Sequence, residues 1–225
     1  MANIFPKATN LFLLKIGLVL SMVGGLVTVG VWYYFTPKYS RVGYQPVQPV
    51  AFQHDIHVGQ LGLDCRYCHS YVEVSGHSNL PATQTCMNCH RDIQKDNPKL
   101  QPVRDSWASG QPIQWVKIHN VPDYAYFNHS AHINRGVSCV SCHGKVNEMK
   151  VVFQDQSQTM AWCLTCHRHP ENAVRPIAAA TPGGKSPVFD LDWQPPADTT
   201  QARLGRELVK KWNINPPTDC AGCHR

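Results

Sequence analysis

Five Cys-x-x-Cys-His motifs contain all ten cysteines of this 225-residue chain. Numbered I to V along the chain, they are Cys65-Cys68-His69, Cys86-Cys89-His90, Cys139-Cys142-His143, Cys163-Cys166-His167 and Cys220-Cys223-His224. This motif is the attachment signature of c-type haem. The two thiols form thioether bonds to haem vinyl groups, and the adjacent imidazole is the proximal ligand of the iron. The sequence therefore predicts five covalently attached haem c groups.

Zinc knuckles and redox dithiols also use Cys-x-x-Cys, but they leave the next residue free to vary. With 12 histidines in 225 residues, five histidines at these specified positions would arise by chance with a probability of roughly four in ten million. Repetition of the complete motif therefore favours haem over both alternatives.

The composition predicts a thin protein core. The chain contains 17 prolines and few long apolar runs, whereas five macrocycles would supply large apolar surfaces around which short segments can pack. We expect mainly irregular coil with short α-helices wrapped around five haems, one N-terminal transmembrane helix and little β-structure. One short helix is predicted from about Gln201 to Trp212, with Thr199 or Thr200 as its cap.

The formal net charge is +6, but two propionates on each of five haems would more than offset it. Lysines and arginines are scattered along the chain, and aromatic residues do not alternate with a basic stripe. These features argue against nucleic acid as a partner. Some basic side chains are expected to pair with propionates.

Residues 16 to 35 carry no charge, and as a helix these twenty residues would extend about 30 Å, the thickness of a bilayer core. Aromatic residues 32 to 35 form a belt at one end, and Pro37 is expected to stop the helix. A cleaved signal peptide is the alternative. It is disfavoured because the next alanine after Ala8 is Ala51, so no Ala-x-Ala-like site follows the apolar run. Since c-type haem is attached after export, residues 38 to 225 are expected on the periplasmic side of the bacterial inner membrane.

An F-x-H-x-x-H segment precedes motif I and recurs before motif III. Phe52, His54, Cys65 and Cys86 are followed by equivalents 75, 75, 74 and 77 residues later, which indicates duplication of a two-haem module. The predicted organisation is a transmembrane anchor at 1–36, an extended linker at 37–51, a first two-haem module at 52–118, a second at 119–168, and a tail with the fifth haem at 169–225.

The duplicated segments supply candidate distal iron ligands, which are His54, His57, His129 and His132. Histidines three residues apart on one helical turn can reach two neighbouring haems. The fifth distal ligand stays open among three candidates, ranked in the order His119, His77 and Met160. His169 is interpreted instead as a propionate or solvent contact.

The F-x-H-x-x-H segment before Cys-x-x-Cys-His resembles class III multihaem cytochromes of the c₃/c₇ type, in which the first histidine serves the local haem and the second a neighbouring one. The stretches WVKIHNVPDYAYFNHSAHINRGVSCVSCHG and MAWCLTCHR, with five haems and one helix, resemble the pentahaem subunit of alternative complex III. That resemblance implies oxidation of membrane quinol and electron delivery to a periplasmic acceptor. The implied partners are membrane-embedded quinol-binding subunits, an iron–sulfur subunit, and a monohaem cytochrome or other acceptor.

The resulting hypothesis is a membrane-anchored electron relay with no catalytic residue of its own. A membrane-anchored tetrahaem quinol dehydrogenase is the first alternative, but in that class the first haem motif follows the helix closely, whereas 29 residues separate Phe35 from Cys65 here. A multihaem reductase of the pentahaem nitrite type is the second. That class carries a Cys-x-x-Cys-Lys motif, and no Cys-x-x-Cys in this chain is followed by lysine.

Overall fold

The computed structural model describes residues 9–35, 40–178 and 184–224. The chain forms two compact units, Met1–Val42 and Gly43–Arg225. Throughout the described residues the secondary structure consists of helices and coil without any strand, and Val137 and Val174 form an isolated antiparallel bridge. The predicted fold class is confirmed: short helices, much coil and one N-terminal apolar helix. The finer module boundaries stay a prediction.

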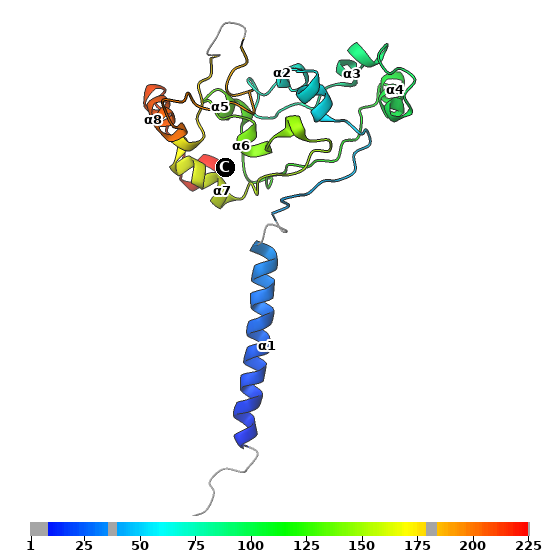
Figure 1. The fold of residues 1–225 in the computed structure, drawn as a ribbon. Helices are drawn as coiled ribbons and strands as arrows, with labels where there is room; N and C mark the ends of the chain where they lie inside the picture. Colours follow the sequence, from blue (N-terminus) through cyan, green and yellow to red (C-terminus); the bar gives the residue numbers. More distant parts are fainter. Residues whose placement is uncertain (1–8, 36–39, 179–183, 225) are drawn as a thin grey trace, which may run out of the picture. The chain divides into compact units, whose positions relative to one another are not determined.

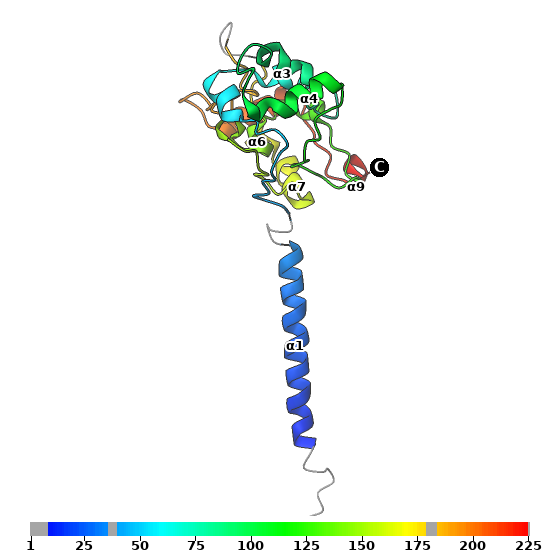
Figure 2. The ribbon, with the colours of Figure 1, turned by 90° about the vertical axis from the view of Figure 1, so that its right-hand side faces the viewer.

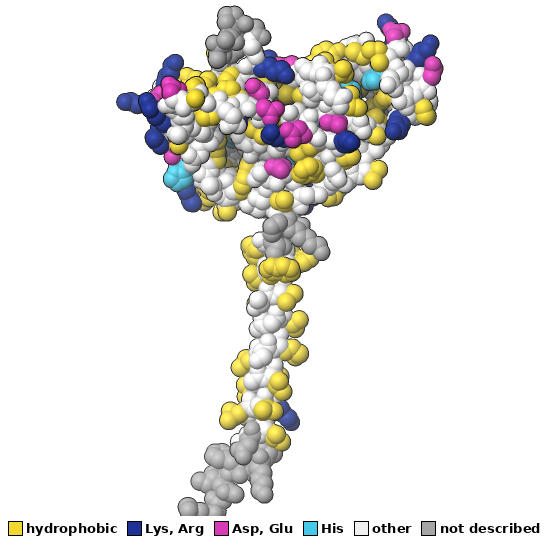
Figure 3. All heavy atoms as spheres, in the orientation of Figure 1, with side chains coloured by type: hydrophobic (Ala, Val, Ile, Leu, Met, Phe, Trp, Pro, Cys, Tyr) yellow, Lys and Arg dark blue, Asp and Glu magenta, His cyan; other side chains and the backbone are white. Residues whose placement is uncertain are grey.

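The N-terminal unit contains one long helix, α1 (Thr9–Phe35). Most of its side chains are hydrophobic (Figure 3), and these are solvent-exposed, reaching 73% at Leu13 and 86% at Phe35. It is long and apolar enough to cross a membrane. The helix begins at Thr9, seven residues before the predicted start at Ile16. The apolar residues from Leu11 to Leu14 extend the helical pattern on the N-terminal side of Lys15. It ends at Phe35 as predicted, and Pro37 lies outside the described residues.

The C-terminal unit consists of short helical segments joined by long irregular ones (Figures 1 and 2). In chain order the segments are η1 (Asp55–Gln60), α2 (Cys65–Cys68), α3 (Thr83–His90), η2 (Pro98–Leu100), α4 (Gln101–Ser109), α5 (His129–Ile133), α6 (Val140–His143), η3 (Val146–Glu148), α7 (Met160–Arg168), η4 (Pro170–Asn172), α8 (Gln201–Lys211) and α9 (Cys220–Cys223).

Each Cys-x-x-Cys-His motif coincides with a helical segment, in the order α2, α3, α6, α7 and α9. Three of these helices begin with a side-chain cap: Asp64 accepts from the backbone N–H of Arg66, Thr159 from that of Trp162, and Asp219 from that of Gly222. Such caps satisfy N–H groups that have no partner within the helix. They define where each one- to two-turn segment begins.

The protein core is small, as predicted. One cluster of buried residues contains Val72, Ile133, Val188 and Phe189, and Cys65 and Cys139 pack against it. The hydroxyl of Ser138, which is only 1% exposed, donates to the carbonyl of Val188 at 2.7 Å. This cluster therefore joins the segment around motif I, the segment around motif III and the tail.

The amphipathic pattern near the C-terminus forms α8 as predicted, one residue shorter at its end. Thr200 is the cap and accepts from the backbone N–H of Arg203. Leu208 and Gly205 are buried, and a β-carbon at Gly205 would collide with the backbone carbonyl of Glu171 in η4. The glycine therefore permits close approach of α8 to η4.

Candidate haem-binding sites

The helical motif segments place both thiols of each motif on one face. Cysteines three residues apart lie on the same side of a helical turn, and the histidine follows directly. All ten cysteines are unpaired thiols, and each is at least partly accessible. Among the described residues, no three His, Cys, Asp or Glu side chains gather where they could hold an isolated metal ion. Two thiols on one face followed directly by a histidine suit attachment of a macrocycle.

The two F-x-H-x-x-H segments have the same geometry. The ring of Phe52 stands edge-on to His54 at 4.8 Å between ring centres and stacks on His57 at 4.4 Å. In the second copy, Phe127 stands edge-on to His129 at 4.7 Å and stacks on His132 at 4.5 Å. Each phenylalanine therefore fixes the angle between two imidazoles in the same way.

The second histidine of each segment faces a proximal histidine. The ring centres of His57 and His90 are 6.1 Å apart, and those of His132 and His167 are 6.2 Å apart. A metal-to-imidazole nitrogen bond is about 2 Å long, and the ring centre lies roughly 1 Å beyond the nitrogen, so imidazoles on opposite sides of one metal have centres about 6 Å apart. Both pairs therefore fit two axial ligands of one iron, at motifs II and IV.

Hydrogen bonds fix which nitrogen of the imidazoles is free. In seven histidines, Nδ1 lies 2.7–3.1 Å from a backbone carbonyl oxygen: His57, His69, His90, His129, His132, His167 and His224. A carbonyl can only accept, so Nδ1 carries the proton and Nε2 keeps its lone pair. Iron ligands need this tautomer, because the second-shell acceptor orients the ring.

Three other histidines with a role in the prediction, His54, His119 and His143, are partly buried near motifs I and III. Burial, with smaller effects of His69 and His57, lowers the pKa of His54 to about 4, and its Nδ1 is buried without a partner. Burial, with a smaller effect of His119, lowers the pKa of His143 to about 3. The Nδ1 of His143 lies 3.3 Å from the Nε2 of His119. The imidazoles of His54 and His143 are therefore held neutral, as iron ligation requires.

The remaining candidates lie in more open positions. Met160, the first residue of α7, is 68% exposed. His77 is exposed, its backbone N–H donates to Ser75, and it is close enough to His129 to lower that residue's pKa, after the larger effect of burial. The imidazole of His169 lies 3.5 Å from the carboxylate of Glu171. The geometry leaves the assignment of the fifth distal ligand as a proposal.

Within each half of the duplicated region, the two motifs lie near each other. Asn88 of motif II donates to the hydroxyl of Tyr67 in motif I at 3.2 Å. In the second half, burial raises the pKa of Cys142 in motif III to about 12, with smaller contributions from Cys166 and Cys163 in motif IV. Motif I therefore adjoins motif II, and motif III adjoins motif IV.

Two further contacts connect these pairs. Cys65 of motif I and Cys139 of motif III pack on the same buried cluster. Motif V approaches motif IV through the carbonyl of Pro217, 2.7 Å from Nδ1 of His167, and α7 and α9 lie close together (Figure 2). The observed contacts thus connect the motifs in the order II, I, III, IV, V.

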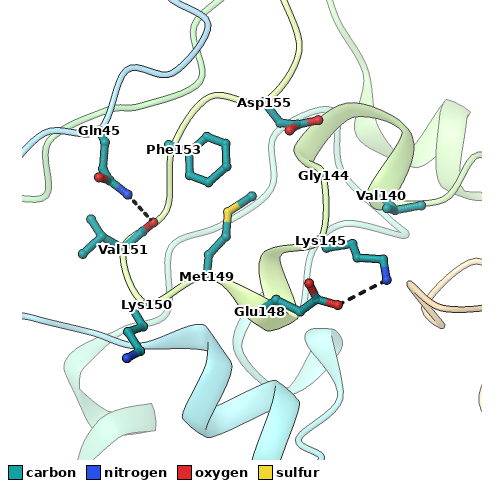
Figure 4. A pocket seen from close by; sticks show the side chains of 10 residues that line it. All are labelled: Gln45, Val140, Gly144, Lys145, Glu148, Met149, Lys150, Val151, Phe153 and Asp155. Carbon is teal, nitrogen blue, oxygen red and sulfur yellow. Dashed lines mark hydrogen bonds and ion pairs between the residues drawn. The ribbon is translucent and has the colours of Figure 1, made fainter.

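A cavity of about 750 Å³ borders motif III (Figure 4). Val140, Met149 and Phe153 give it apolar walls, and Lys145 and Lys150 lie at its edge. Lys145 pairs with Asp192 at 2.7 Å and with Glu148 at 3.2 Å. Glu148 and Asp155 also line the cavity. Its apolar walls fit a macrocycle, and Lys150 is the lining lysine that forms no ion pair with a carboxylate among the described residues.

The backbone acceptors of the imidazoles could not be identified from the sequence. Gly76, Asn79, Tyr124 and Pro217 supply carbonyls to His129, His69, His224 and His167. Every residue has a carbonyl, so no sequence signal marks these four. Tyr124 lies 100 residues from its partner, and such contacts depend on the fold.

Comparison with known proteins gives a family match over most of the chain. The family described as cytochrome c7 and related cytochrome c matches residues 50–106 and 125–225. The menaquinone reductase multihaem cytochrome c subunit of Nitratidesulfovibrio vulgaris is 34% identical over 130 residues, covering 57% of this chain and 56% of that protein.

Two further relatives are more distant. Cytochrome c-552 of Desulfotalea psychrophila is 25% identical over 233 residues, covering 83% of this chain and 45% of that protein. The acrylate reductase cytochrome subunit of Shewanella woodyi is 25% identical over 115 residues, covering 51% of this chain and 72% of that protein. The chain thus spans about half the length of the first two relatives.

Proposed function

Because the chain belongs to the family of cytochrome c7 and related cytochromes c, we propose that it is the pentahaem subunit of a membrane-bound quinol-oxidising complex and relays electrons to a periplasmic acceptor. It is a multihaem c-type cytochrome related to cytochrome subunits of reductase complexes. Membrane-associated electron transfer follows from this relationship. The number of haems, the complex and the acceptor are parts of the proposal.

The observation that carries the proposal is the proximity of successive motifs in the order II, I, III, IV and V. Haem supplies reversible one-electron chemistry when bound. Under this proposal the attachment sites form a series, with motifs II and V at its two ends. A row of adjacent redox sites with two ends is suited to connecting two partners.

The histidines support transfer without substrate chemistry. The ring-centre distances of 6.1 Å between His57 and His90 and 6.2 Å between His132 and His167 support two imidazole ligands for the haem at motif II and for the haem at motif IV. An iron with two such ligands has no open position for a substrate. The polypeptide therefore acts as an electron-transfer subunit and not as an enzyme on its own.

Helix α1 is proposed as an uncleaved anchor in the bacterial inner membrane, with the C-terminal unit on the periplasmic side. Its apolar side chains are exposed along the whole helix, and such a surface is stable only inside lipid or against other apolar helices. The proposed partners are quinol-binding membrane subunits, an iron–sulfur subunit, and a monohaem cytochrome or other periplasmic acceptor. Alternative complex III is the assembly that this set resembles.

A second candidate differs in the direction of electron flow. The relative with 34% identity is named a menaquinone reductase subunit. Under this second candidate function, the chain delivers electrons to a complex that reduces quinone. The same series of sites serves both directions. The quinone partner distinguishes them.

The test uses the complex solubilised from its own membrane. Native and denaturing mass spectrometry count subunits and covalent haems, and EPR spectra of the ferric protein report their spin states. Five low-spin haems with membrane subunits bound, and haem reduction on adding quinol, support the first proposal. Haem oxidation by added menaquinone, with no reduction by quinol, supports the second. A lone chain with an open high-spin iron contradicts both.

A further inference from the structure

His143 differs from the other four motif histidines in the partner of its Nδ1. In His69, His90, His167 and His224 that partner is a backbone carbonyl. In His143 it is the Nε2 of another imidazole, His119, at 3.3 Å. The two ring centres are 4.3 Å apart, with the planes at 77°.

This distance does not fit two ligands of one iron. Imidazoles on opposite sides of a metal have centres about 6 Å apart, as in the pairs His57–His90 and His132–His167. The separation between His119 and His143 is nearly 2 Å shorter than these two. It is an edge-to-face contact that brings Nδ1 of His143 within hydrogen-bond distance of Nε2 of His119.

The proton positions follow from the required role of His143. Its Nε2 must be unprotonated to bind iron, so its Nδ1 carries the proton and donates to Nε2 of His119. Nε2 of His119, the nitrogen that lies 3.3 Å from this Nδ1, accepts the proton with its lone pair. The same nitrogen would then not be available to a haem iron.

We propose that His119 is a positioning residue: it accepts the Nδ1 proton of His143 and orients that imidazole as the proximal ligand of the third haem, and it is not a distal iron ligand. A ring nitrogen replaces the carbonyl used at the other motifs, so the electron density at this iron ligand is set by a side chain. Second-shell acceptors of this kind tune the reduction potential of the metal. The fifth distal position then falls to His77 or Met160.

The test compares H119A with H119Q in the holoprotein, with R206A as the control. Arg206 is exposed on α8 and has no role in the sites described. EPR spectra of the ferric proteins count high-spin and low-spin haems, and potentiometric titration resolves their midpoint potentials. In H119A we expect every haem to stay low-spin and one midpoint potential to rise, because His143 loses its acceptor. In H119Q the amide oxygen restores an acceptor, so the potential should move back toward the wild-type value.

A new high-spin haem in both H119A and H119Q overturns the proposal, since it identifies His119 as an iron ligand. Unchanged potentials in H119A also overturn it. If H119A does not accumulate, H119Q decides alone: all haems low-spin with one shifted potential supports the proposal, and a high-spin haem contradicts it. The inference rests on haem attachment at motif III and not on the direction of electron flow, so its failure leaves the proposed function standing.

Discussion

At the scale of single residues, the protonated Nδ1 atoms are what prepare the imidazoles for iron. Each of seven backbone carbonyls accepts one Nδ1–H. This fixes the tautomer, so Nε2 keeps the lone pair that an iron ligand needs. Phe52 and Phe127 add a second constraint, because each stacks on one imidazole and stands edge-on to another. The chain's own contacts therefore constrain the orientation of these imidazoles.

Replacement of His57 is predicted to open one iron. In H57A, His90 loses the imidazole that faces it at 6.1 Å, so one low-spin haem should become high-spin while covalent haem content is unchanged. EPR and optical spectra of the ferric protein measure this. H132A should behave alike at motif IV, and H169A should leave the spectrum unaltered. A wholly low-spin spectrum in H57A would show that the pairing is wrong.

The sequence predicts these ligands but not their supports. Repetition of F-x-H-x-x-H at a constant offset selects His54, His57, His129 and His132, because side chains that recur together need a common reason. The acceptor of His129 is the carbonyl of Gly76, 53 residues earlier. Long-range backbone contacts of this kind carry no side-chain pattern, so the sequence leaves them open.

At the scale of elements, the cap of α2 couples motif I to pH. Asp64 accepts from the backbone and side chain of Arg66, and the side-chain hydrogen bond is the main cause that lowers the pKa of Asp64. A carboxylate with a lowered folded-state pKa stabilises the protein above its unfolded pKa, and this contribution is lost as pH falls through the folded pKa.

The variant D64A is predicted to lower the free energy of unfolding by about 0.5–1 kcal/mol at pH 7, since the pair is partly exposed and solvent weakens its attraction. The difference from wild type should shrink below about pH 4, where the carboxyl group begins to protonate in the unfolded chain. Thermal unfolding of the ferric holoprotein across pH measures it. D64N keeps a capping oxygen without the charge, so its smaller deficit should also shrink below this pH. If the stability deficit of D64A stayed constant across pH, the charge of Asp64 would not be its cause.

Helix α8 provides a test of packing against propensity. Alanine in place of glycine ordinarily favours a helix by about 1 kcal/mol. In G205A, however, the new β-carbon would meet the backbone carbonyl of Glu171, and overpacking of this kind costs about 1–3 kcal/mol. We expect a lower melting temperature and faster proteolysis of the tail. R206A, on the exposed side of the same helix, is the control and should change little. A stabilised G205A would mean that α8 does not pack tightly on η4.

Helices with a clear period were predictable, and irregular segments were not. The apolar spacing and the threonine before it predict α8 to within one residue, because amphipathic period and cap agree. The segment η1, with its π-helical turn from Asp55 to Gln60, has no comparable pattern. Its backbone is stabilised by a distant segment, because the backbone N–H of Asp55 donates to the carbonyl of Met149 at 3.3 Å.

At the scale of the whole molecule, the motifs differ in how much of the fold depends on them. Cys139 of motif III packs on the buried cluster that also contacts Cys65. Motif V is peripheral: Cys220 is exposed, and its segment is held by bonds from His224 to Tyr124 and from Tyr126 to Cys223. A core this thin depends on the macrocycles, so an inner haem should matter more for folding than a terminal one.

We therefore predict opposite results for two double variants. C139A/C142A should give a misfolded chain that is degraded, whereas C220A/C223A should accumulate with one haem fewer and the remaining haems low-spin. Haem-stained gels, intact mass and EPR spectra of the membrane fraction measure this. Equal loss of both proteins would contradict the difference between inner and terminal sites.

The terminal variant also tests whether the sites operate in series. If motif V is the end that meets the acceptor, the complex carrying C220A/C223A should still be reduced by quinol but should no longer reduce the acceptor. If motif V is the entry, quinol should fail to reduce the remaining haems. Both results require motif V to be an end of the row, as its contact with motif IV through Pro217 and His167 indicates. Unchanged rates at both steps would show that electrons bypass this site, and the series II, I, III, IV, V would then be wrong at its last member.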